Sequence, residues 1–175
     1  MVNEVVVLTL LLAEPKHGYR LLEEADRLIG PDETFDTKRL YTTLRRLELQ
    51  GAIAASPEPS PRRGAPQRKV YRITPQGQEI LRRLVADPAN ALDRRRFFVS
   101  LSLWVFLDGE ARRDLLQRRF AWLDEETRHM AAVAALPDHT PWSEAVAAFQ
   151  LRQVVEERRW LQDLAKEMGI DGSRG

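Results

Sequence analysis

The stretch DTKRLYTTLRRLELQGAI, residues 36–53, decides the fold. Asp36 is of a type that caps helix starts and Gly51 of a type that ends helices, so we expect a helix from Asp36 to about Gln50. At roughly 100° per residue, one face of this helix is apolar and would be buried. That face carries Leu40, Thr43, Leu44 and Leu47.

The opposite face of this helix is basic and carries hydroxyl groups. It holds Lys38, Thr42, Arg45 and Leu49, with Arg39 and Arg46 on one flank and Tyr41 on the other. An ordinary surface helix usually mixes Glu and Lys there, whereas this face has only Lys, Arg and Thr in its first two turns. The pattern is typical of a helix that lies in the DNA major groove, where Lys38 or Arg45 could pair with guanine and Thr42 with a thymine methyl. Tyr41 could contact a phosphate or pack against the neighbouring hairpin.

Two helices are expected before this one. Residues 2–13 are almost wholly apolar, which fits a buried strand or a buried helix, and the length and the leucine-rich end favour a helix. Pro15 ends it. Residues 17–29 then place apolar side chains at helical spacing, until Gly30 and Pro31 end the second helix.

A hairpin and a fourth helix are expected after it. Residues 52–55 and 68–73 predict strands, and the loop between them is rich in proline and contains Arg62 and Arg63. Thr74 and Pro75 are a strong helix start. The order helix, helix, helix, strand, basic loop, strand, helix predicts a winged helix-turn-helix domain over residues 1–86. Arg62, Arg63, Arg68 and Lys69 would contact phosphates.

The second half, residues 87–175, predicts a helical domain, so the fold class is mainly α with a small β-hairpin. We expect helical stretches at about 91–107, 109–135 and 141–168. The last is apolar on two faces, one with Trp142, Val146 and Phe149. The other is predicted to form a homodimer interface and carries Leu151, Val154, Val155, Leu161 and Met168. Trp104 and Trp122 are candidates to line a pocket for a planar apolar effector.

The charge is unevenly distributed along the chain. The 175 residues carry a formal net charge of only +1. Residues 37–72, however, hold nine Lys and Arg against two acids, a net +7, whereas residues 87–175 carry −2. A local positive field of this size indicates a polyanionic partner, and duplex DNA is the partner we expect.

Other features argue against an enzyme and against a membrane protein. There is no cysteine, which suits a reducing cytoplasm. The apolar run at 5–13 is too short to span a bilayer, and it lacks the features of a signal peptide. His17, His129 and His139 lie far apart, and no phosphate-binding loop or nucleophile elbow occurs, so neither a metal nor a cofactor is expected. His17 is expected to be structural.

Three motifs in the first 86 residues resemble those of the PadR family of bacterial transcriptional regulators. Pro15-Lys16-His17-Gly18-Tyr19 resembles the family's Pro-x-His-Gly-Tyr. The run from Leu40 to Ile53 resembles Leu-Tyr-Pro-x-Leu-x-Arg-Leu-Glu-x-x-Gly-Leu-Ile. The run from Arg68 to Gly77 resembles Arg-Lys-x-Tyr-x-Leu-Thr-x-x-Gly. The second half resembles the family's longer variant in its helix number and in its 97–108 stretch.

The resemblance implies a repressor that binds a palindromic operator as a homodimer and is released by a small aromatic effector. The sequence departs from the family at Lys38, Arg39 and Thr42, where relatives usually have Gly-Ser or Gly-Thr and then Pro. Because these positions face the groove, the resemblance implies no particular operator sequence. Two other functions fit the sequence less well. A protein–protein adaptor would not need the +7 segment, and an RNA-binding regulator would more often expose aromatic side chains for stacking.

Overall fold

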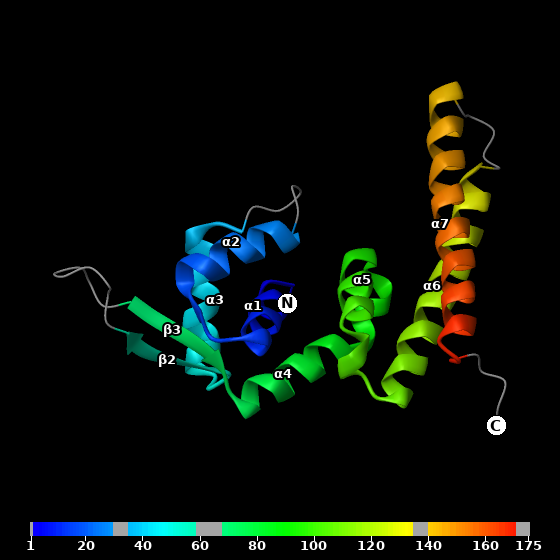
Figure 1. Ribbon diagram of the computed structural model, residues 1–175. Helices are drawn as coiled ribbons and strands as arrows, with labels where there is room; N and C mark the ends of the chain where they lie inside the picture. Colours follow the sequence, from blue (N-terminus) through cyan, green and yellow to red (C-terminus); the bar gives the residue numbers. More distant parts are fainter. Residues whose placement is uncertain (1, 30–34, 59–67, 135–139, 171–175) are drawn as a thin grey trace. The chain divides into compact units, whose positions relative to one another are not determined.

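The chain folds into two compact units. The computed structural model describes residues 2–29, 35–58, 68–134 and 140–170. The units are Met1–Asp87 and Pro88–Gly175, divided at the Asp87-Pro88 dipeptide. Helices make up most of both, and one small sheet lies in the first (Figure 1). The predicted fold class, mainly α with a small β-hairpin, is confirmed.

The first unit is a winged helix. Its helices are α1 (Val2–Ala13), α2 (Gly18–Ile29), α3 (Thr37–Leu49) and α4 (Pro75–Ala86), and its strands are β1 (Lys16–His17), β2 (Ile53–Glu58) and β3 (Arg68–Ile73). The strands form an antiparallel sheet in the order β1-β3-β2. Residues 2–13 form a helix, as their length predicted, and this helix buries Val5, Val6, Val7, Leu8 and Leu11.

Strand β1 was not predicted. The sequence pattern placed His17 in the second helix, but Lys16 and His17 pair with Tyr71 and Val70 of β3, and α2 begins at Gly18. A strand of two residues has no periodicity by which it could be recognised. The first hairpin strand is also longer than expected, because the pairing with β3 continues to Glu58.

Polar contacts fix both ends of α3 and the start of α4. Asp36 caps α3 by accepting a hydrogen bond from the backbone N–H of Arg39 at 2.7 Å. Gly51, at φ 67°, takes the left-handed conformation that follows the helix. Thr74 accepts from the backbone N–H of Gly77 at 3.0 Å and donates to the carbonyl of Gly51 at 2.7 Å. The two helix starts expected at Asp36 and Thr74 are therefore confirmed.

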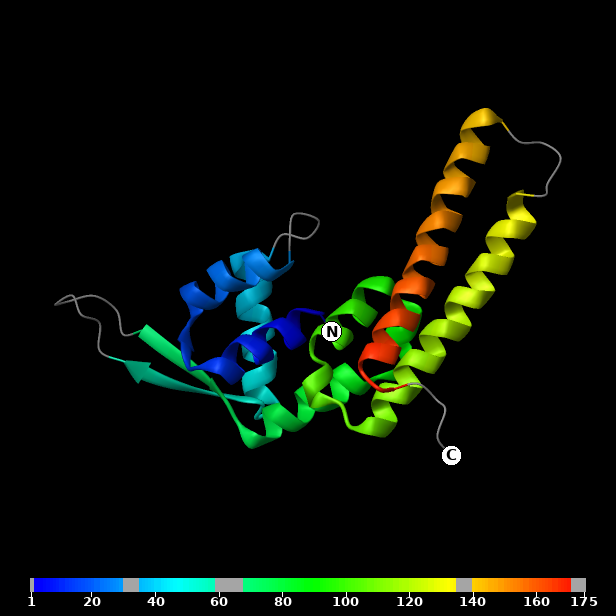
Figure 2. The ribbon, with the colours of Figure 1, turned by 45° about the vertical axis from the view of Figure 1, so that its right-hand side comes forward.

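The second unit is helical. It contains the short 3₁₀ helices η1 (Pro88–Leu92) and η2 (Trp104–Phe106) and the α-helices α5 (Arg94–Ser102), α6 (Gly109–Ala134) and α7 (Pro141–Glu167). Helices α6 and α7 lie side by side over most of their length (Figures 1 and 2). The single stretch predicted at 91–107 is wrong, because Asp93 caps a new helix there by accepting from the backbone N–H of Arg96.

A buried arginine lies in the core of the second unit. Arg119 is 0% exposed and continues the apolar stripe of α6 between Leu116 and Leu123. Its Nε donates to Glu157 of α7 at 2.7 Å, and its Nη1 donates to the carbonyl of Ala91 at 3.0 Å. A buried charge is tolerated only with such partners. The network therefore joins η1, α6 and α7.

Candidate nucleic-acid interface

Helix α3 divides into the two faces predicted from the sequence. Leu40, Thr43, Leu44 and Leu47 are buried against the first unit. The exposed residues include every side chain predicted on the basic face and its flanks, which are Lys38, Arg39, Tyr41, Thr42, Arg45, Arg46 and Leu49. Since one face anchors the helix to its unit, the other is presented to solvent with the composition that a major groove requires.

The basic side chains of α3 differ in their partners. No described residue forms an ion pair or hydrogen bond with the side chains of Lys38 or Arg45. Arg46 instead extends to α1, where its Nη2 lies 3.0 Å from Oε1 of Glu4. Lys38 and Arg45 are therefore available to an external anion, whereas Arg46 already has a counter-charge within the protein.

Tyr41 packs against the start of α2, a contact that the sequence did not predict and that does not decide between the two predicted alternatives, a phosphate and the hairpin. A Cβ atom added to Gly18 would lie 3.0 Å from the phenolic oxygen of Tyr41. Tyr41 also lies close to Tyr71 of β3, whose pKa is raised by burial and, to a smaller extent, by Tyr41. The phenol nevertheless remains 51% exposed. A larger residue at position 18 would therefore displace the Tyr41 phenol.

The wing is the hairpin formed by β2, β3 and the loop between them. Its described part presents two of the four predicted cations. Arg68 and Lys69 are exposed at the start of β3, opposite Glu58 and Pro57 of β2. Arg62 and Arg63 lie outside the described residues. Glu58, an acid on this otherwise basic hairpin, lies 3.0 Å from Nε2 of His17 on β1. His17 thus connects β1 to the end of β2 that leads into the loop, a structural contact of the kind expected for it.

A known protein family matches most of this first unit. Residues 7–83 match the model of the transcriptional regulator PadR-like family. A Mycobacterium tuberculosis protein named "Probable transcriptional regulator" is 33% identical over 82 residues, which cover 47% of this chain and 42% of that protein. The chain thus matches less than half the length of this curated relative. Most of the N-terminal unit therefore resembles the PadR-like family.

Solved structures are also similar. Bacillus subtilis PadR in complex with operator DNA is 16% identical with a TM-score of 0.42, and the match covers 98% of this chain and 100% of that one. A transcriptional regulator from Clostridium thermocellum is 23% identical with a TM-score of 0.41, over 46% of this chain and 74% of that one. The family description and the name of the curated relative are both those of transcriptional regulators and not of enzymes.

The predicted effector residues lie apart within the unit that follows the PadR-like domain. Trp104 lines a hollow of about 110 Å³ with Leu101, Leu116, Leu164, Ala165, Met168 and Ile170. Trp122 lines another, of about 160 Å³, and its ring lies 4.3 Å from the guanidinium of Arg119. Each of the two tryptophans lines a hollow, but not the same one, and Trp122 also covers the buried Arg119.

The faces of α7 also differ from the expectation. Leu161 is 0% exposed and belongs to the core of its own unit, so its assignment to a free dimer face is wrong. Leu151 and Val154 are half-buried, and only Val155 and Met168 of the predicted set are exposed. The more exposed apolar face is the other one, with Trp142, Val146 and Phe149. The sequence shows both stripes but not which one α6 covers.

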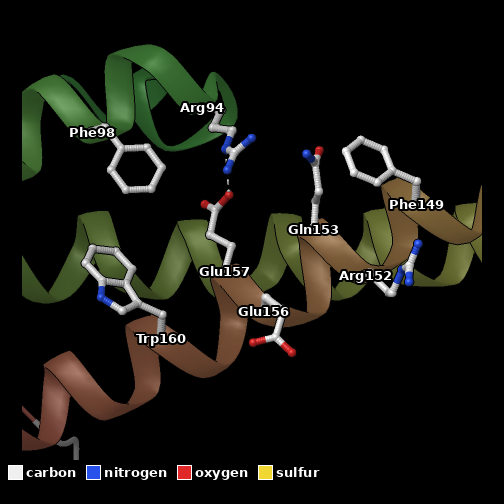
Figure 3. A pocket seen from close by; sticks show the side chains of 8 residues that line it. All are labelled: Arg94, Phe98, Phe149, Arg152, Gln153, Glu156, Glu157 and Trp160. Atoms are coloured by element: carbon white, nitrogen blue, oxygen red, sulfur yellow. Dashed lines mark ion pairs between the residues drawn. The ribbon is translucent and has the colours of Figure 1, made fainter.

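A groove of about 610 Å³ runs between α5 and α7 (Figure 3). At one end the rings of Phe98 and Trp160 stack with centroids 5.7 Å apart. Beside them Arg94 lies 3.1 Å from Glu157, whose other oxygen accepts from the buried Arg119. The remaining lining residues are Phe149, Arg152, Gln153 and Glu156. The groove combines aromatic walls with two guanidinium groups.

Among the described residues, no group of His, Asp and Glu side chains is placed to hold a metal ion. None of the described helices is both long enough and apolar enough to cross a membrane. His129 lies on α6 with its side chain exposed, far along the chain from His17, and His139 falls outside the described residues.

Proposed function

We propose that this protein is a cytoplasmic transcriptional repressor that binds a palindromic operator in duplex DNA as a homodimer. The observation that carries the proposal is the outer face of α3. Lys38, Thr42 and Arg45 are exposed there, and the two cations have no partner among the described residues, while the opposite face is buried. In the major groove the arginine and the lysine would pair with guanine, and the threonine methyl with thymine. Arg68 and Lys69 would contact phosphates from the wing.

The first experiment measures how DNA binding depends on salt. Two subunits that each present the +7 segment would make roughly 6–10 phosphate contacts, so the logarithm of the binding constant should fall against the logarithm of salt concentration with a slope of about −5 to −9. A slope near zero would contradict DNA binding. A gel shift that compares duplex DNA with RNA tests the two alternative functions. An RNA-binding regulator would shift the RNA, and a protein–protein adaptor would shift neither nucleic acid.

The dimer is inferred from α7. Trp142, Val146 and Phe149 follow each other at spacings of four and three, the heptad spacing by which helices pack against helices. They are exposed on the single chain, with Trp142 83% exposed. A second copy of α7 is the occupant that such a stripe fits, because a two-fold axis brings the same stripe from both subunits together. One winged helix reads few base pairs, so pairing also supplies specificity.

Release by a small aromatic effector is the regulatory part of the proposal. Phe98 and Trp160 give the groove between α5 and α7 a stacking surface, and Arg152, which forms no ion pair with a described residue, favours a ring that bears an anionic group. A dimer on its operator excludes other proteins from that DNA. An effector that binds the DNA-free form better would therefore relieve repression.

Calorimetry with naphthoate and its uncharged amide tests the effector site. We expect naphthoate to bind more tightly than the amide and to lose binding in Trp160→Leu but not in Trp104→Leu. By linkage, operator DNA must change naphthoate affinity by the same factor as naphthoate changes operator affinity. Binding without this reciprocal effect would show an incidental groove, and loss in Trp104→Leu alone would place the ligand in the smaller hollow.

A further inference from the structure

The motif arginine of the recognition helix has a partner that its exposed position on α3 would not predict. Arg46 occupies the arginine position of the Leu-Tyr-x-x-Leu-x-Arg-Leu-Glu run, beside Arg45 in sequence but roughly 100° away around the helix. Its Nη2 lies 3.0 Å from Oε1 of Glu4. Glu4 is in the first turn of α1, which packs against α3.

The environment of Glu4 makes this contact significant. The side chain of Glu4 is only 14% exposed, and it is the one charged side chain of α1, a mostly apolar helix that buries Val5, Val6, Val7, Leu8 and Leu11. A carboxylate withdrawn from water needs a cation or several donors nearby, and Arg46 brings a cation to it. The partially buried acid thus holds the guanidinium of Arg46 toward α1, on the flank of α3 rather than at the centre of its outer face.

A second contact fixes the other flank of the same helix. The phenol of Tyr41, roughly 140° around α3 from Arg46, lies against Gly18 at the start of α2. The two flanks of α3 are therefore each attached to another helix, to α1 through Arg46 and to α2 through Tyr41. Between these attachments lie Lys38, Thr42 and Arg45, which would enter the groove.

We infer that Arg46 is a positioning residue, which sets the orientation of α3 through Glu4 and makes no phosphate or base contact of its own. This inference rests on the proposed DNA binding. It gives Glu4, an acidic residue outside the basic surface, a role in operator affinity. It also reverses the simple electrostatic expectation, since removal of an acid should otherwise strengthen binding to a polyanion.

The test compares Glu4→Gln, Arg46→Gln and the neutralisation Lys69→Gln at a proposed phosphate contact, with operator binding followed by fluorescence anisotropy over a range of salt concentrations. Because the Arg46 side of the ion pair is 53% exposed, losing the pair changes an equilibrium by about two- to fivefold, so Glu4→Gln and Arg46→Gln should each weaken operator binding by that factor. Neither should change the salt slope, whereas Lys69→Gln should make it shallower by about one unit. The double variant Glu4→Gln/Arg46→Gln should bind no worse than either single variant.

Two results would overturn the inference. One is tighter or unchanged binding in Glu4→Gln. The other is a salt slope that becomes as shallow in Arg46→Gln as in Lys69→Gln, which would make Arg46 a phosphate contact. If the wild-type chain bound no duplex, the proposed function would fail instead. The pair would then still be tested by thermal unfolding, where the double variant should lose no more stability than the singles, and additive losses would overturn the pairing itself.

Discussion

Gly77 shows how a single residue in a motif is fixed by packing. It lies in the first turn of α4, where a Cβ atom would come within 2.0 Å of the backbone oxygen of Ala52 and 2.8 Å of the Ile73 side chain. The same oxygen accepts hydrogen bonds from the N–H and the hydroxyl of Thr74. The glycine therefore allows α4 to begin against the turn that follows α3.

Gly77→Ala should be strongly destabilising, because the added methyl group would clash with the backbone of Ala52, and a backbone segment moves away less easily than a flexible side chain. Overpacking of this kind costs about 1–3 kcal/mol of the free energy of unfolding. The matched control is Gly109→Ala at the start of α6, where the nearest atom to an added Cβ is 3.8 Å away, so stability should be unchanged or slightly raised. Urea unfolding of both variants measures this. Equal midpoints would contradict the close approach at Gly77.

Lys16 makes the stability of the first unit depend on pH. Its buried ammonium lies 2.7 Å from Glu14 and 3.0 Å from Glu24. The hydrogen bond from Lys16 is the main cause that lowers the pKa of Glu24 below its ordinary 4.5. A lowered folded-state pKa contributes stability that is present above the unfolded pKa and is lost as the pH falls through the folded one.

Glu24→Gln should therefore lower the unfolding temperature at pH 7, and the difference from wild type should shrink as the pH falls below about 4.5. Glu23→Gln is the control, because Glu23 pairs only at the surface with Arg27, where both side chains are more than half exposed. It should have little effect at either pH. A pH-independent difference for Glu24→Gln would mean that packing, and not the ion pair, is lost.

At the scale of elements, helix α3 and the wing should contribute differently to operator recognition. Arg45 on the outer face of α3 would pair with a base, so Arg45→Ala should cost about 1–3 kcal/mol for the operator and relax preference at one base pair per half-site. Lys69 on β3 would contact phosphate, so Lys69→Ala should weaken all sequences equally and make the salt slope shallower by about one unit. Competition binding with a panel of operator variants separates them. An unchanged ranking in Arg45→Ala would contradict the orientation of α3.

Elements with local signals could be predicted from the sequence. The faces and caps of α3, the start of α4 and strand β3 follow from patterns within one segment, and the structure confirms them. Strand β1 could not be predicted, because its two residues are extended only through pairing with β3. The same holds for Glu4 and Arg46, which are far apart in sequence and meet only when α1 packs on α3.

Tertiary packing also decides which face of α7 is buried, and the sequence alone could not predict this. The sequence did contain a signal of the buried ion pair: Arg119 lies on the apolar stripe of α6, and Glu157 lies four residues before the buried Leu161 on α7. In the structure this pair joins α6 to α7, and the stripe of Trp142, Val146 and Phe149 remains exposed.

At the scale of the whole molecule, function would depend on two chains. A monomer would present one α3 and one wing, so it would make about half the phosphate contacts and read only one half-site. Operator affinity should therefore depend on protein concentration through the dimer equilibrium. The exposed stripe of α7 is where that equilibrium can be altered without disturbing the fold of either unit.

Val146→Glu should give a folded monomer that binds the operator weakly, with a salt slope about half that of wild type. Val146 is 56% exposed, so a glutamate is tolerated on the single chain, but in a helix pair it would be buried without a partner and oppose association. Leu161→Glu should unfold the second unit instead, because Leu161 is fully buried, and Gln162→Glu on the exposed side of α7 should change neither property. Sedimentation velocity and circular dichroism distinguish the three. A Val146→Glu variant that remains dimeric and binds normally would show that the subunits pair through another surface.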